Sequence, residues 1–90
     1  MKFEYDPDKS QSNKIKHGID FEESKALWHD ACAITAPAQS ETESRFLVVG
    51  RIHGIFWTAV ITYRGEAVRI ISVRRSRKHE EERYGEINNC

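Results

Sequence analysis

Near residue 77 the chain gathers side chains of the types that bind phosphate and move protons. The run Arg74-Arg75-Ser76-Arg77-Lys78-His79-Glu80 joins the end of a β-patterned segment to the start of a helical one. Clustered cations repel each other, so folding alone gives little reason to gather them, whereas a phosphate ligand gives a direct one. A planar guanidinium group can bind two phosphate oxygens at once. The sequence therefore predicts a phosphate-binding site at this junction.

The charges of the helix that follows run against its dipole. Ser76 is a plausible N-cap, which puts Arg77 and Lys78 in the first turn, where cations cost about 0.3 to 1 kcal/mol each. Their pairs with Glu81 and Glu82 have the weaker orientation. A helix N-terminus with added cations favours an anion, which supports the phosphate interpretation. The alternative is that the glutamates neutralise the cluster and the segment is a solvated helix face.

Glu80 and His17 are the candidates for moving a proton. Glu80 lies one turn into the helix and could face Arg74, and Tyr84 shares its helix face. The His17 imidazole is suited to acid–base work near neutral pH. The alternatives are an ion pair for Glu80, a packed ring for Tyr84 and a helix-capping role for His17. Besides Arg74, the cations expected to contact phosphate are Lys16, Arg69, Arg75, Arg77 and Lys78.

We expect no metal and no cofactor, because the four histidines and two cysteines lack ligand spacing and no glycine-rich phosphate loop is present. His29 and His53 are interpreted as structural or surface residues. Cys32 and Cys90 are interpreted as reduced thiols. No signal peptide or apolar run long enough to span a bilayer is visible, so we expect a cytoplasmic protein that does not contact a membrane.

The first half of the chain is predicted to hold two helices after a short strand at residues 2–5. Asp6 can cap a helix over residues 7–17, whose first residue is a proline. The run Asp20-Phe21-Glu22-Glu23 has capping-box spacing and predicts a second helix that ends near residue 30. A strand is possible at residues 31–36, before a loop.

From residue 45 onward the apolar residues alternate, which predicts strands over 45–52, 55–63 and 67–75 and a final helix over 76–87. Short turns join the strands, so an antiparallel meander is expected. Strict alternation would put Arg69 and Arg75 on one face of the last strand and Arg74 on the other. The same alternation would separate Val68 and Ile70 from Ile71 and Val73. We therefore predict one α+β domain over residues 1–90.

The net charge of zero hides a marked asymmetry. Residues 1–44 hold nine acids and five lysines, whereas residues 45–90 hold nine cations, including all eight arginines, and five acids. A surface of one sign suits a polyanion, although an acidic protein partner could recognise it too.

Several segments, in their order and spacing, resemble the BrnT family of bacterial type II toxins. The residues that carry the resemblance are Phe3-Glu4-Tyr5-Asp6-Pro7, Asn13, Lys16-His17-Gly18-Ile19-Asp20-Phe21-Glu22-Glu23, Arg69-Ile70-Ile71-Ser72-Val73-Arg74-Arg75, Glu80 and Tyr84.

The resemblance implies an endoribonuclease toxin that inhibits translation, with a small RelE-like fold in which a β-meander packs with two N-terminal helices and one C-terminal helix. It also implies a cognate BrnA-like antitoxin with a ribbon-helix-helix DNA-binding domain, so that DNA is contacted only through the antitoxin. Metal-independent cleavage of RNA would rest on cations and one acid–base group. The alternative is a module that binds RNA or antitoxin through the same arginines and cleaves nothing.

Overall fold

Nine elements make up the computed structural model, which describes residues 1–87. In order they are β1 (Lys2–Glu4), α1 (Pro7–His17), α2 (Phe21–Ser24), the 3-10 helix η1 (Lys25–His29), β2 (Ile34–Ala38), β3 (Arg45–Ile52), β4 (Ile55–Arg64), β5 (Ala67–Arg75) and α3 (Lys78–Ile87). None of the helices in this described part of the chain is long and apolar enough to cross a membrane.

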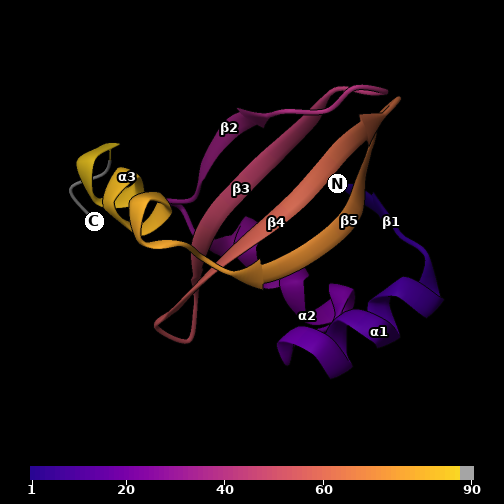
Figure 1. Cartoon of the computed structure of the whole chain (residues 1–90), viewed down its shortest axis with the longest axis horizontal. Coiled ribbons are helices and arrows are strands. Elements are labelled where there is room, and N and C mark those ends of the chain that lie inside the picture. The colour runs from indigo at the N-terminus through magenta and orange to yellow at the C-terminus, as the bar shows by residue number, and fades with distance from the viewer. Residues whose placement is uncertain (88–90) are drawn as a thin grey trace.

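The strands form one five-stranded sheet in the order β1-β5-β4-β3-β2 (Figure 1). β2 to β5 are antiparallel neighbours, and β1 lies parallel beside β5. The predicted α+β class and the antiparallel meander are thus confirmed. The predicted helix over residues 20–30 is in fact two short pieces, because α2 tightens into η1 at Lys25. This tightening brings Leu27 into the core, where it is fully buried.

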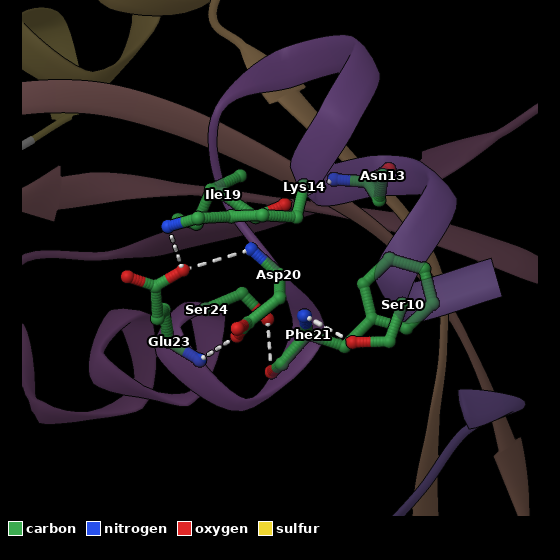
Figure 2. A network of polar contacts seen from close by, with 8 residues as sticks. All are labelled: Ser10, Asn13, Lys14, Ile19, Asp20, Phe21, Glu23 and Ser24. Atoms are coloured by element: carbon green, nitrogen blue, oxygen red, sulfur yellow. Dashed lines mark hydrogen bonds and ion pairs between the residues drawn. The ribbon is translucent and has the colours of Figure 1, made fainter. Parts of the chain in front are cut away.

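Local capping rules explain the two N-terminal helices. The Asp6 carboxylate accepts the first N–H groups of α1, and Gly18 ends the helix at a φ of 84°. Asp20 and Glu23 form the predicted capping box at the start of α2 (Figure 2). The buried Ser10 hydroxyl accepts the N–H of Phe21, so α1 and α2 are joined directly.

The two faces of the sheet carry separate cores. α1, α2 and η1 cover one face, where Phe21 and Leu27 pack against apolar residues of β3, β4 and β5. α3 packs against β3 on the other face, where Tyr84 meets Ile34 and Val49 (Figure 1). Part of the second face therefore depends on α3 for its cover.

A bulge in β5 changes which side chains share a face. Val60 pairs with Ser72 but Ile61 pairs with Ile70, so β5 has one extra residue at Ile71. As a result Val68, Ile70 and Val73 all join the core under α1 and α2, contrary to the expected separation.

The same bulge overturns the predicted arrangement of the arginines. Arg69 and Arg74 pair with Thr62 and Thr58, four residues apart on β4, and so share a face, whereas Arg75 lies on the other. The expectation that Arg69 and Arg75 share a face is wrong, because strict alternation does not survive an inserted residue.

Cys32 is disulfide-bonded rather than a reduced thiol, so this part of the cysteine interpretation is wrong. Composition alone does not show which thiols the fold brings within reach. The expectation for Cys90 falls outside the described residues.

Candidate active site

Arg74 and Glu80 form a two-point ion pair that joins β5 to α3. The Nη1–Oε1 and Nη2–Oε2 distances are 2.8 and 2.9 Å. The Thr58 hydroxyl donates to Glu80 Oε1 over 3.0 Å, and the Arg77 backbone N–H donates to the same oxygen over 2.8 Å. The Glu80 side chain is consequently enclosed by donors, and the residue is only 4% exposed.

These contacts set the ionisation of Glu80. Burial acts most strongly and would raise the pKa of Glu80, but the bonds from Arg74, Arg77 and Thr58 together outweigh it and lower the pKa to about 2. Glu80 in turn raises the pKa of Arg74. The carboxylate is therefore charged at neutral pH but poorly suited to accept a proton, and the guanidinium is occupied by its partner.

Ser76 does not cap α3 as the sequence suggested. Its hydroxyl lies 2.7 Å from the Thr58 hydroxyl, and the first turn of α3 closes on the Arg77 carbonyl, which accepts the N–H of Glu80 over 3.0 Å. Arg77 thus takes the N-cap position, and Glu80 reaches back to its N–H as in half of a capping box. The strong buried carboxylate contact at Glu80 displaces the weaker hydroxyl cap.

Cations on both sides of this pair remain exposed. Arg75 holds its guanidinium 5.6 Å from the centre of the Trp57 ring, on the face opposite Arg74. The Arg77 and Lys78 side chains are exposed at the start of α3. Within residues 1–87, none of these three cations forms an ion pair with a carboxylate. Of the four cations at the junction, Arg74 is thus bound by Glu80, whereas Arg75, Arg77 and Lys78 are accessible to a ligand.

A buried asparagine ties α1, which ends with Lys16 and His17, to β5 one residue before Arg74. The Asn13 amide N–H donates to the carbonyls of Val73 and Ile19, both over 2.8 Å, and its oxygen accepts the Val73 N–H over 3.2 Å. Figure 2 shows Asn13 on α1 and Ile19 in the loop that follows this helix. Gly18 and Trp57 line one cavity of about 320 Å³, and Trp57 is also the residue that Arg75 covers.

Tyr84 and Arg69 have side-chain partners of their own. The buried Tyr84 hydroxyl donates to Asp30 Oδ2 over 2.9 Å, and burial and Asp30 raise its pKa. Arg69 forms an ion pair with Glu4 at 3.6 Å. Arg69 is six residues before Arg75 on β5, so the two arginines are roughly 20 Å apart along the strand. The structure therefore places Arg69 away from residues 74–80, whereas Tyr84 lies on α3, one helical turn after Glu80.

Asn13, Thr58 and Asp30 hold the site together but were not among the residues predicted from the sequence. Asn13 had a signal, because α1 contains one apolar residue, Ile15, which is 84% exposed, so a helix of this composition must bury polar side chains. Thr58 and Asp30 had none, since each acts through a partner distant in sequence. The described residues contain no group of three or more side chains that could hold a metal ion.

A search of curated proteins gave no match to this chain. A family profile described as "Ribonuclease toxin, BrnT, of type II toxin-antitoxin system" matches residues 5–80, which run from the end of β1 into the first turn of α3. The match thus includes α1, strands β2 to β5 and the Arg74–Glu80 pair, and it confirms the resemblance. The chain therefore belongs to the BrnT family of ribonuclease toxins of type II toxin-antitoxin systems, with RNA as its substrate and an antitoxin as its partner.

Proposed function

We propose that this toxin cleaves RNA without a metal ion at the junction surface, which we define as the half-buried His17 and the exposed side chains of Lys16, Arg75, Arg77 and Lys78. The observation that carries the proposal is the division of the cations at the junction. Arg74 is held by the buried Glu80, whereas the cations around it are exposed and have no carboxylate partner in the described chain. Because exposed, unpaired cations repel one another, a polyanion stabilises this arrangement.

The reaction that fits these groups is transfer of the phosphate to the neighbouring 2′-oxygen. The 2′-oxygen loses its proton and forms a bond to phosphorus, and the bond from phosphorus to the 5′-oxygen breaks. The leaving oxygen takes up a proton, which gives a 2′,3′-cyclic phosphate and a 5′-hydroxyl. Arg75 and Arg77 would stabilise the additional negative charge on the phosphorus oxygens in the transition state.

His17 is our candidate for the proton transfer, in preference to Glu80. The Glu80 oxygens already accept bonds from three residues and its pKa lies at about 2, so it is a weak base at neutral pH. His17 is half-buried at the end of α1, next to Gly18 and the cavity that Trp57 lines. In this proposal Arg74 and Glu80 are positioning residues, which fix where Arg75 and Arg77 stand.

We further propose that the cognate antitoxin is BrnA-like, with a ribbon-helix-helix domain, and that the pair acts in the cytoplasm, where the RNA is. The family resemblance supports this kind of partner, and the unpaired cations of the junction surface support an acidic segment as the part that inhibits cleavage. DNA would then be contacted by the antitoxin alone.

The test is cleavage of end-labelled RNA by pure protein, with and without EDTA, beside His17→Asn and a control, Arg64→Ala. Arg64 is an exposed cation whose only ion pair in residues 1–87 is with Glu4, at the edge of the sheet. We expect cleavage that survives EDTA, ends in a cyclic phosphate, falls about 100-fold or more in His17→Asn and is unchanged in the control.

Loss of cleavage in EDTA would overturn the metal-independent mechanism. Cleavage by His17→Asn at the wild-type rate would remove His17 from the reaction. Salt-sensitive binding of RNA by wild type without any cleavage would favour the binding module instead.

A further inference from the structure

We propose that a pocket around Arg51 binds a second phosphate of the RNA, next to the one that the junction surface holds. This Arg51 pocket has a volume of about 380 Å³ and is lined, among others, by His29, Asp30, Arg51, His53 and Tyr84. The inference rests on the proposed function of the junction surface and extends the substrate-binding site beyond it.

Among the lining residues within 1–87, Asp30 is the one carboxylate, and both of its oxygens accept hydrogen bonds. Asp30 Oδ1 accepts the Cys32 N–H over 2.9 Å, and Oδ2 accepts the Arg51 N–H and the Tyr84 hydroxyl, both over 2.9 Å. Burial acts most strongly and would raise the pKa of Asp30, but these donors outweigh it and lower the pKa. Asp30 thus holds the pocket walls together, and the charge of Arg51 also helps to lower its pKa, although no Asp30–Arg51 ion pair forms within residues 1–87.

The guanidinium of Arg51 lies against two aromatic rings, and no carboxylate of residues 1–87 forms an ion pair with it. It lies 5.5 Å from the centre of the Phe56 ring and 5.9 Å from that of Tyr84, and it forms no ion pair within residues 1–87. Aromatic rings fix a guanidinium through its flat face and carry no charge that neutralises it. The group is therefore placed for an anion.

Two histidines from separate elements complete the pocket. His29 ends η1, and His53 stands in the β3–β4 turn with a φ of 51°; both are exposed. Imidazoles donate N–H bonds to phosphate and add positive charge when protonated. Arg51 and His53, two residues apart, thus line the same cavity as His29 from η1, and this combination suits a phosphate group.

The pocket lies close enough to the junction surface for one RNA strand to reach both. Arg51 pairs with Phe56, whose carbonyl accepts the Ser76 N–H over 3.2 Å, so Arg51 and Ser76 are two strand spacings, roughly 10 Å, apart. His53 also lines the cavity that contains Trp57, beside Arg75. This continuity favours the RNA as the ligand over an acidic segment of the antitoxin.

The experiment measures how salt weakens binding of an uncleavable 2′-deoxy oligonucleotide of about eight nucleotides, at several salt concentrations. The variants are Arg51→Gln, Arg51→Lys and His29→Gln/His53→Asn; Asn tolerates the positive φ of the turn. Arg75→Ala reports on the junction surface, Arg64→Ala is the control, and urea unfolding shows that each variant folds.

Log affinity falls as log salt rises, and we expect Arg51→Gln to make this fall less steep by about 1 unit of slope. Arg51→Lys should keep the wild-type slope. The double histidine variant should bind less tightly, and Arg75→Ala should lose a further unit of slope independently. For an RNA of the same length, Arg51→Gln should raise KM about tenfold and leave kcat unchanged, as expected for a residue that only binds.

A wild-type slope and KM in Arg51→Gln would overturn the Arg51 pocket, whatever Arg75→Ala does. A loss of kcat would also overturn it, because the pocket would then belong to the reacting centre. A wild-type slope in Arg75→Ala alone would count against the junction surface instead. Weaker antitoxin binding by Arg51→Gln, with unchanged RNA binding, would assign the pocket to the antitoxin.

Discussion

At the scale of single residues, the burial of Glu80 decides which groups can do chemistry. A carboxylate that is 4% exposed and bound by Arg74, Thr58 and the Arg77 N–H is a structural anchor. The same contacts remove Arg74 from the cations that are available to a substrate. The residues that do not share in this anchor, among them Arg75 and His17, are therefore the ones that we expect to meet RNA.

Removing one member of the pair should destabilise the fold more than removing both. Arg74→Ala leaves the buried Glu80 charge uncompensated and should cost about 3 to 5 kcal/mol of unfolding free energy, whereas Arg74→Met/Glu80→Met should cost much less. Urea unfolding measures both, with Arg64→Ala, which we expect to stay within about 1 kcal/mol of wild type, as the exposed control. Equal losses in the single and double variants would contradict this role.

The stability of the fold should also depend on Glu80 at acidic pH. Folding lowers the pKa of Glu80 from 4.5 to about 2, so its contribution is complete above the unfolded value and is lost as the pH falls from about 4.5 towards 2. The contribution corresponds to about 3 kcal/mol. Unfolding free energies of wild type and Glu80→Gln should converge over this pH range, and a constant difference would refute the assignment.

At the scale of elements, local rules predicted the helices and strands well, but not their distortions. The caps at Asp6 and Asp20 depend on residues within one turn, so their spacing in the sequence was sufficient. The bulge at Ile71 has no comparable local signal, because it follows from how β5 aligns with β4. It was this bulge that reversed the predicted faces of the arginines, and with them part of the candidate site.

The polar attachment of α1 leads to a prediction at this scale. Asn13→Ala would leave the buried N–H and carbonyl groups at Val73 and Ile19 without partners, which should cost about 2 to 4 kcal/mol. Gln11→Ala, on the exposed side of the same helix, should change stability by less than about 0.5 kcal/mol. Urea unfolding compares the two, and similar small losses would show that Asn13 does not anchor α1.

At the scale of the whole molecule, the acidic and basic halves of the chain form different parts of the fold. The segment from residue 45 onward supplies β3, β4, β5 and α3, and all eight arginines lie in it. The acidic first half supplies α1, α2 and η1, which cover one face of the sheet, and His17 at the end of α1. The sequence could predict the polyanion partner from this asymmetry. It could not predict that Arg74 would be held by the buried Glu80, since that depends on α3 docking back onto the sheet.

The most direct test of the account is the single-turnover rate of RNA cleavage by Arg75→Ala/Arg77→Ala, at saturating protein. Both side chains are exposed, and the cation–π contact of Arg75 with Trp57 is worth only about 0.5 to 1 kcal/mol, so the variant should remain folded. We predict a rate at least about 100-fold below that of wild type, because two groups that stabilise the transition state are gone. A folded variant that cleaves RNA within about twofold of the wild-type rate would contradict the central claim that the junction surface is the active site.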